Sequence, residues 1–95
     1  MLDDLTNLQA LLKDSTLLAT KGYIAGEWCD GENGKTFPVF NPARGDVITD
    51  VADISRTQTA GAISIAEKAQ KLWAARPAKE RSNLLRNWYN LMMEN

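Results

Sequence analysis

Apolar residues recur at helical spacing through the C-terminal half of the chain. Ser55 and Gln58 have the spacing of a capping box, in which each side chain bonds the backbone amide of the other residue. Beyond them, the apolar residues on one helical face are Ala62, Ala66, Ala69 and Trp73. The pattern stops at Arg76, before Pro77, which cannot continue a helix. The sequence therefore predicts a long helix over residues 55–76.

A second helical pattern follows Pro77. Proline suits the first turn of a helix, because the N–H that it lacks would have no hydrogen-bond partner there. The apolar stripe of this helix consists of Leu84, Leu85, Trp88, Leu91 and Met92. A helix end usually carries a Gly or Asn just past the stripe, often with a Pro beyond. Only Met93, Glu94 and Asn95 follow here. We therefore expect this helix to continue into residues beyond Asn95.

The first residues of the chain are rich in leucine. Leu5, Leu8 and Leu12 share one helical face, which predicts a short amphipathic helix over residues 3–13. The charged residues that interrupt this region are Asp3, Asp4, Lys13 and Asp14. They leave neither a signal-peptide core nor a stretch of about twenty apolar residues. A cytoplasmic protein that does not enter membranes is the expectation.

The middle of the chain has the pattern of a β-hairpin. The segment KGYIAGEWCD, residues 21–30, is typical of a strand, and the residues expected on one side are Ile24, Gly26 and Trp28. Asn33 and Gly34 then tolerate the positive φ of a tight turn. The return strand KTFPVF contains Pro38, which cannot donate to a ladder and so favours an edge position. We therefore expect a hairpin over residues 22–40.

A second turn and a third strand follow the predicted hairpin. Asn41 before Pro42 is biased away from helix, and Gly45 accepts backbone angles that other residues resist. The segment VITDVADI, residues 47–54, fits a strand. The predicted fold class is α/β, in the order short helix, β-hairpin, strand and two long helices. No linker or repeat marks a domain boundary within residues 1–95.

Composition narrows the possible functions. The chain has 95 residues, of which 44% are hydrophobic and 24% charged, as in ordinary globular proteins. Its formal net charge of -1 supplies no field that would attract nucleic acid or an anionic membrane. A single cysteine excludes an intrachain disulfide and fits a reducing compartment. The absence of histidine removes the commonest general base and metal ligand.

Two motifs suggest chemistry but lack its context. The tripeptide GKT at residues 34–36 matches the end of the phosphate-binding loop of nucleotide hydrolases. That loop also needs a Gly at the position where this chain has Cys29, and a helix must follow it directly. An extended segment follows instead, so a hairpin turn explains these residues better. Cys29 itself is predicted to lie within a strand. A thiol becomes a nucleophile only when its pKa is lowered, and no histidine can do so here.

Acidic and aromatic residues also have structural explanations. Asp46, Asp50 and Asp53 lack the central Gly and the closing Glu of a calcium loop, so we interpret them as polar positions on a strand. The three tryptophans each lie on an apolar face and are expected in a core: Trp28, Trp73 and Trp88. The residues alone therefore predict no catalytic residue, no cofactor-binding residue and no metal ligand in this chain.

Taken in order, several motifs resemble the N-terminal end of the aldehyde dehydrogenase superfamily over residues 17–95. Ile24, Gly26 and Trp28 resemble the I-x-G-x-W pattern of that family's opening hairpin, and FNPARGDVITDV resembles its NP-x-x-G turn and the following strand. The alternating alanines that end in LWAARPAKERSNLL are similar to the family's first long helix, with its Trp at Trp73, and Arg81 is similar to the Arg that begins the family's next helix. The segment LLRNWYNLMMEN most resembles the bacterial succinate-semialdehyde dehydrogenase branch, of which glutarate-semialdehyde dehydrogenases are near neighbours.

The resemblance implies an enzyme that oxidises an aldehyde to an acid with NAD or NADP. In the family a catalytic Cys attacks the carbonyl, amide donors hold the oxyanion, and a Glu activates the water that releases the acid. The family's nucleophile stands in a Gly-Gln-x-Cys context, which Cys29 lacks. No functional residue is therefore carried over to this chain.

The expectation is thus an N-terminal fragment, residues 1–95, of the cofactor-binding domain of a semialdehyde dehydrogenase, inactive and without cofactor by itself. The implied partners are the remainder of the enzyme, a small aldehyde substrate, and further subunits of a homo-oligomer. Two alternatives remain. The chain could be an independent small α/β module whose exposed apolar face binds a protein. A nucleotide-hydrolysing domain built on residues 34–36 is the other alternative.

Overall fold

The structure, a computed structural model, describes residues 8–95. Residues 8–11 are helical, and a short 3-10 helix, η1 (Ser15–Leu17), follows them. The predicted helix over residues 3–13 is thus present at 8–11, while residues 3–7 lie outside the described part of the chain. Asp14 caps η1, because its side chain accepts a hydrogen bond from the amide of Thr16 at 3.0 Å.

The first hairpin is shorter than the sequence predicts. Strands β1 (Gly22–Ile24) and β2 (Glu27–Cys29) pair antiparallel, so the chain reverses at Ala25 and Gly26. Both turn residues have positive φ, 54° and 80°, as a two-residue hairpin turn of the primed type requires. The prediction of one strand through residues 21–30 was wrong. Ala25 lacks the turn preference of Asn or Asp, so its residue type did not indicate a turn there.

The reversal places two aromatic residues opposite each other across the hairpin. Tyr23 pairs with Trp28, and their ring centroids are 4.8 Å apart. A tilted aromatic pair of this kind contributes about 0.5–1.5 kcal/mol beyond its burial. In the predicted single strand, Trp28 lies on one side with Ile24 and Gly26, and alternation puts Tyr23 on the other side. The register contradicts this.

A turn leads from the first hairpin to the second. The predicted positive φ is present at Asn33, 58°, and Gly34, 72°, within the 3-10 turn η2 (Glu32–Gly34). This turn joins strands of different sheets, and β3 (Thr36–Phe40) pairs with β4 (Val47–Ala52), not with β1. The single hairpin predicted over residues 22–40 is therefore replaced by two hairpins.

The second hairpin has a regular register with one irregularity. Pro38 lies opposite Asp50, and the register shifts between Val39 and Phe40. The sheet has only two strands, so Pro38 occupies an edge strand as its missing amide predicted. Strand β4 covers the first part of the strand expected over residues 47–54.

Helix α2 (Arg56–Ala74) begins with the predicted capping box. The hydroxyl of Ser55 accepts from the amide of Gln58 at 3.1 Å, and the Gln58 side-chain oxygen accepts from the Ser55 amide at 2.9 Å. The helix ends two residues before the predicted Arg76, and its C-cap residue Ala75 remains near helical angles.

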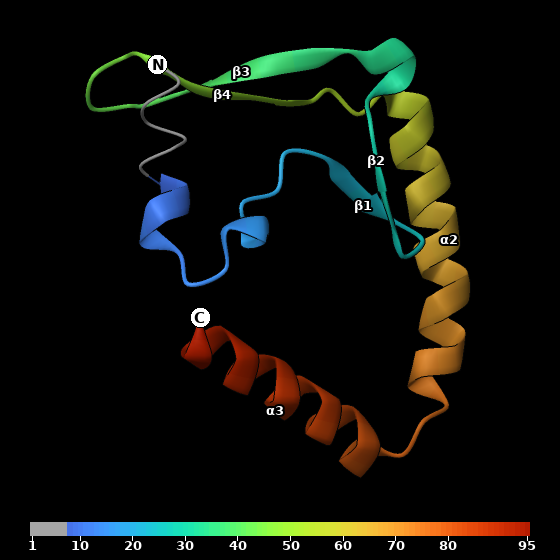
Figure 1. Ribbon diagram of the computed structural model, residues 1–95. Coiled ribbons are helices and arrows are strands. Elements are labelled where there is room, and N and C mark those ends of the chain that lie inside the picture. The colour runs from blue at the N-terminus through green and yellow to red at the C-terminus, as the bar shows by residue number, and fades with distance from the viewer. Residues whose placement is uncertain (1–7) are drawn as a thin grey trace.

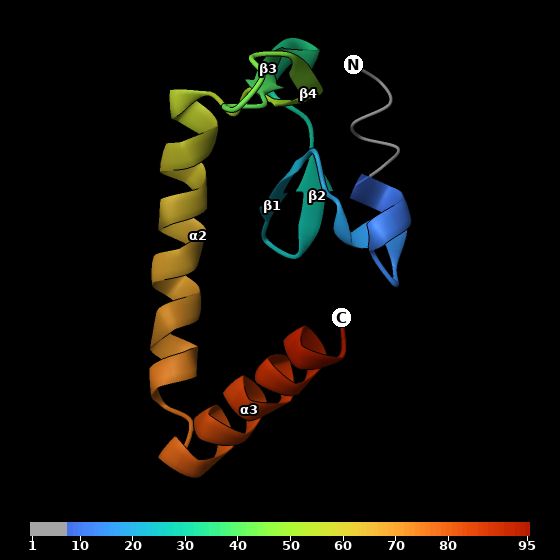
Figure 2. The same cartoon turned by 90° about the vertical axis from the view of Figure 1, so that its left-hand side faces the viewer.

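Helix α3 (Ala78–Glu94) starts directly after Pro77, which is its N-cap residue. At its other end the side-chain amide of Asn95 donates to the carbonyl of Leu91 at 2.9 Å. The two long helices meet at an angle, and the short N-terminal helical segment faces the end of α3 (Figures 1 and 2). The mixed helix-and-strand fold class is confirmed.

A group of hydrogen bonds joins the stranded half of the chain to the start of α2. The Gln58 side chain accepts from the amide of Glu32 at 3.0 Å and donates to the carbonyl of Asp30 at 3.0 Å. Gly31, between these two residues, is the one residue of 8–95 that is buried. A Cβ there would lie 2.4 Å from the carbonyl oxygen of Asp53, so no side chain fits.

The described residues contain no hydrophobic core. No hydrophobic residue among 8–95 is buried, and many large ones are exposed, including Trp28 at 58% and Trp88 at 61%. The radius of gyration is 16.9 Å, against about 12 Å for a compact domain of this length. The expected core around the tryptophans is not found within residues 8–95, where Trp28 and Trp88 are exposed and Trp73 is half-buried.

We predict that Gln58→Ala loosens the junction between η2 and α2. The substitution removes the acceptor of the Glu32 and Ser55 amides, and each lost hydrogen bond costs about 1 kcal/mol net. Hydrogen-exchange mass spectrometry of the 95-residue chain should show about fivefold faster exchange at both amides. Thr57→Ala, an exposed substitution in the same helical turn, should leave both rates unchanged.

A matched pair of glycine substitutions tests the close approach at Gly31. Gly31→Ala should cost about 1–3 kcal/mol, because its Cβ would overlap backbone atoms. Gly61→Ala should stabilise by about 0.5–1 kcal/mol, since the position lies within α2 with open space around it. Circular dichroism during urea titration should move the two midpoints in opposite directions. A Gly31→Ala variant as stable as the parent chain would contradict the observed packing.

Candidate functional site

The GKT tripeptide does not form a phosphate-binding loop. Gly34 ends the 3-10 turn η2, and Thr36 begins strand β3. A phosphate-binding loop presents the amide groups at the start of a helix, whereas a strand follows here. These residues do form a turn, but it joins two sheets and is not the predicted hairpin turn. The nucleotide-hydrolase alternative has no structural support at this position.

Cys29 lies where a structural thiol is expected. It is the last residue of β2, pairs with Gly22 across the hairpin, and is half-buried. The Cys29 sulfur lies 3.4 Å from the position that a Cβ on Gly22 would take. The thiol therefore packs against the neighbouring strand, and Cys29 lies in a strand as predicted.

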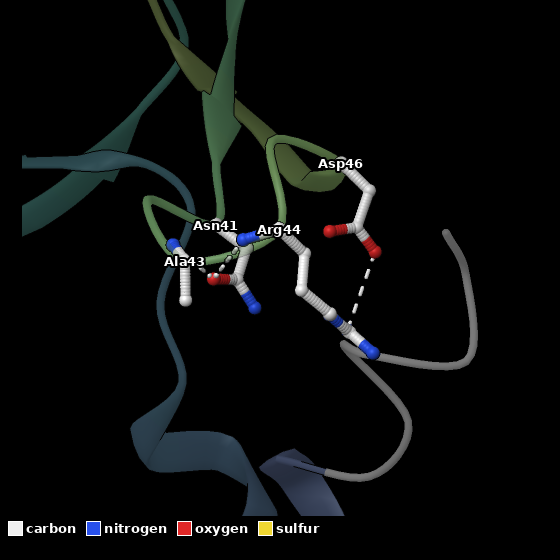
Figure 3. Close-up of polar contacts among 4 residues, drawn as sticks. All are labelled: Asn41, Ala43, Arg44 and Asp46. Atoms are coloured by element: carbon white, nitrogen blue, oxygen red, sulfur yellow. Dashed lines mark hydrogen bonds and ion pairs between the residues drawn. The ribbon is translucent and has the colours of Figure 1, made fainter.

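The turn between β3 and β4 is ordered by the side chain of Asn41 (Figure 3). The Asn41 side-chain oxygen accepts from the amides of Ala43 at 2.9 Å and Arg44 at 3.4 Å. The Asn41 backbone amide donates to the carbonyl of Asp46 at 2.7 Å, and that of Gly45, with φ of 80°, donates to the carbonyl of Asn41 at 2.7 Å. This arrangement is an Asx turn closed by backbone bonds.

The acidic residues of this region do not gather into a metal site. The Asp46 carboxylate forms an ion pair with Arg44 at 3.2 Å, and Figure 3 shows the two side chains pointing toward one another. Within residues 8–95, no group of three or more Cys, Asp or Glu side chains is placed to hold a metal ion. Asp50 lies on β4 opposite Pro38, consistent with its interpretation as a polar strand position.

The most prominent surface feature is apolar. The large hydrophobic residues exposed on the two long helices are Ile63, Ile65, Leu72, Leu84, Leu85, Trp88, Tyr89, Leu91, Met92 and Met93. A contiguous exposed apolar surface is unusual on a monomeric protein and is typical of a surface that contacts other protein, a membrane or a ligand. Neither long helix, nor any other helix of residues 8–95, is long and apolar enough to cross a membrane.

Part of this surface forms a groove between the two ends of the chain. The groove has a volume of about 550 Å³, and its lining residues are Asp14, Leu17, Trp88, Leu91, Met92 and Asn95. At its edge the Lys13 side chain donates to the carbonyl of Glu94 at 2.7 Å. The hydroxyl and the amide of Thr16 both donate hydrogen bonds to the Asp14 carboxylate. These bonds, chiefly the one from the hydroxyl, hold the pKa of the carboxyl below its ordinary value.

The sequence pattern identified only half of this groove. Trp88, Leu91 and Met92 belong to the apolar stripe that helical spacing indicates. Leu17 lies at the opposite end of the sequence, so no local pattern could place it against them. No catalytic, cofactor-binding or metal-binding residue is assigned in this groove, and the prediction that the chain contributes none stays a prediction.

Comparison with known proteins adds independent information. A profile described as the aldehyde dehydrogenase family matches residues 28–95. A glutarate-semialdehyde dehydrogenase of Pseudomonas putida is 49% identical over 84 residues, which cover 88% of this chain and 18% of the relative. The NADP-dependent succinate-semialdehyde dehydrogenase of Escherichia coli is 46% identical over 83 residues, or 87% of this chain and 17% of that enzyme.

Solved structures agree with the sequence relatives. A crystal structure of an aldehyde dehydrogenase from Brucella melitensis biovar abortus matches with a TM-score of 0.82 and 41% identity, covering 90% of this chain and 18% of that one. A succinate-semialdehyde dehydrogenase from Burkholderia pseudomallei matches with a TM-score of 0.81 and 39% identity, covering 90% of this chain and 18% of that one.

The chain thus spans about a fifth of the length of the enzymes that it matches, at their N-terminal end. The matched region contains both long helices and the second hairpin, the elements on which the exposed apolar surface and the Asn41 turn lie. Family profile, sequence relatives and fold agree, and the chain belongs to the aldehyde dehydrogenase family.

Proposed function

We propose that this chain forms the N-terminal part of an NAD(P)-dependent dehydrogenase that oxidises a semialdehyde to the corresponding acid. The main support is its similarity, at 49% and 46% identity, to enzymes named as a glutarate-semialdehyde dehydrogenase and a succinate-semialdehyde dehydrogenase. Succinate semialdehyde is the proposed substrate, and glutarate semialdehyde is the second candidate. Both molecules carry a carboxylate at the end opposite the aldehyde.

The proposed role of these residues is that of scaffold within the cofactor-binding domain. In the family a Cys thiolate attacks the aldehyde and hydride passes to the nicotinamide. Cys29 is a poor candidate for that thiolate, since it lies at the end of a strand against Gly22 and the chain has no histidine to activate it. The catalytic groups and the NAD or NADP site are therefore assigned to the part of the enzyme outside these residues.

An independent protein-binding module is the less favoured alternative. Such a module needs a hydrophobic core of its own, and no hydrophobic residue among 8–95 is buried. A cytoplasmic homo-oligomer is the proposed form of the whole enzyme, as the family resemblance implies. The single cysteine is compatible with the reducing environment of that compartment.

A chimera tests the proposal. Residues 1–95 replace the matching segment of the Pseudomonas putida glutarate-semialdehyde dehydrogenase, and the formation of reduced nicotinamide is measured with both semialdehydes and with NAD and NADP. We expect the chimera to retain activity within about tenfold of the parent enzyme, because a scaffold segment that is 49% identical preserves the packing around the site. The isolated 95-residue chain should show no turnover.

The variant Cys29→Ala provides the control for the catalytic assignment. In the chimera it should leave kcat unchanged, because the thiol is assigned a packing role. A loss of activity of more than about a hundredfold in a folded Cys29→Ala chimera would place the thiol in the chemistry. Turnover by the isolated chain, or a folded chimera without activity, would contradict the scaffold role.

A further inference from the structure

The dipeptide Asn33–Gly34 is the exposed part of the turn η2. Asn33 has φ of 58° and ψ of 24°, Gly34 has φ of 72°, and both residues are exposed. Within residues 8–95, the Asn33 side chain has no hydrogen-bond partner. A Cβ on Gly34 would have no neighbour within 4 Å apart from the adjacent residues. The side-chain amide of Asn33 therefore precedes a backbone amide that no side chain shields.

An asparagine followed by glycine permits attack of the backbone on the side chain. The Gly34 nitrogen loses its proton to hydroxide and bonds to Cγ of Asn33, and the bond from Cγ to Nδ2 breaks and releases ammonia. Water then opens the resulting succinimide ring at one of its two carbonyls. The product is aspartate, or isoaspartate with the main chain running through Cγ. The net reaction consumes one water, releases one ammonia and involves no oxidant or reductant.

Glycine favours this reaction because it has no side chain to obstruct the ring and its backbone rotates freely. The asparagines of the second hairpin and of α3 are less suited to it. Asn41 precedes Pro42, whose ring nitrogen carries no proton to lose. Asn83, Asn87 and Asn90 lie within α3, and each precedes a leucine or a tryptophan. The amide that follows each of them donates to a carbonyl of the preceding helical turn.

The pair Asp30–Gly31 has the same potential chemistry, but it is held in place. Gly31 is buried, and a Cβ there would lie 2.4 Å from the carbonyl oxygen of Asp53. The Asp30 carboxylate pairs with Lys21 at 3.3 Å, and the Asp30 carbonyl accepts from the Gln58 side chain at 3.0 Å. The exposed pair in η2 is therefore the reactive one.

One hydrogen bond protects the exposed pair in the folded turn. The Gly34 amide donates to the carbonyl of Gly31 at 2.9 Å. The nitrogen must leave this bond before it reaches Cγ of Asn33, so the reaction proceeds from an opened turn. Loss of a single hydrogen bond changes such an equilibrium by about fivefold. The fold therefore slows the reaction only modestly.

Isoaspartate in η2 adds one methylene to the main chain between two anchored residues. Before the addition, the Glu32 amide donates to the Gln58 side chain at 3.0 Å. After it, the Lys35 carbonyl accepts from the Asp53 amide at 2.8 Å, which extends the pairing of β3 with β4. A turn fixed at both ends cannot take up another atom without loss of a bond. The single bond to the Gln58 side chain is the weaker of the two.

We propose that Asn33–Gly34 is a site of spontaneous deamidation, and that isoaspartate formed there releases Glu32 from Gln58 on α2. Aspartate, the other product, keeps the main chain intact and tolerates positive φ, so it leaves the junction closed. The inference is independent of the proposed function, because it rests on η2 alone and neither an aldehyde nor a nicotinamide takes part.

Incubation of the 95-residue chain in mildly alkaline heavy-oxygen water, followed by peptide mass spectrometry, tests the site. We expect Asn33 to convert to aspartate and isoaspartate that carry heavy oxygen, while Asn41 and Asn83 stay unchanged over the same period. An isoaspartyl methyltransferase with labelled S-adenosylmethionine should mark the same peptide. An unconverted Asn33, or conversion of Asn83 at an equal rate, would overturn the proposed site.

A variant and a denaturant provide the controls. Asn33→Gln lengthens the side chain by one methylene and disfavours the ring, so this variant should show no conversion in the time that the parent chain needs. In urea the parent should react about fivefold faster, as loss of the bond to Gly31 predicts. An acceleration of about a hundredfold or more would show that folding suppresses the reaction, and would overturn the proposal.

Hydrogen-exchange mass spectrometry tests the release of Glu32. The isoaspartyl form of the chain is separated by reversed-phase chromatography, and Asn33→Asp is its matched control of equal charge. We expect about fivefold faster exchange at the Glu32 amide in the isoaspartyl form, because the bond to Gln58 is lost. Asn33→Asp should exchange there as the parent chain does. Equal exchange in the isoaspartyl form and in Asn33→Asp would reject the release.

Discussion

The side-chain amide of Gln58 holds the helical half of this chain to its stranded half. Its oxygen accepts from the amides of Ser55 and Glu32, and its nitrogen donates to the carbonyl of Asp30. Because Gln58 also completes the capping box of α2, the start of the helix and the end of the first hairpin are fixed by one residue. Gly31 allows the approach, since a side chain there would overlap the backbone.

Polar contacts of this kind orient the elements but cannot supply most of the stability of a fold. A hydrogen bond contributes about 1 kcal/mol net, whereas burial of one large apolar side chain contributes about 1.5–3 kcal/mol. Residues 8–95 bury no such side chain. The same open arrangement occurs as one part of a much larger enzyme of the family, with a TM-score of 0.82. In the proposed enzyme, the apolar faces of α2 and α3 are therefore interpreted as inner surfaces.

The local features were predictable because each depends on residues that are close in sequence. The capping box at Ser55, the start of a helix after Pro77 and the positive φ at Asn33 all follow from the chemistry of one or two side chains. The turn at Ala25 was missed for the same reason, since alanine offers no local preference for positive φ and the surrounding structure imposes it.

The sequence by itself determined the positions of the helices, most strand residues and the apolar stripe of α3. Its motifs also indicated the family. Only the tertiary structure decided which strands pair, that Tyr23 faces Trp28, and that Leu17 forms a groove with α3. Strand pairing and groove formation join residues that are distant in sequence, and their free energy depends on backbone hydrogen bonds and apolar contacts that no local pattern encodes. The exposure of Trp88 likewise depends on which elements lie against α3, and the helical pattern alone does not give this.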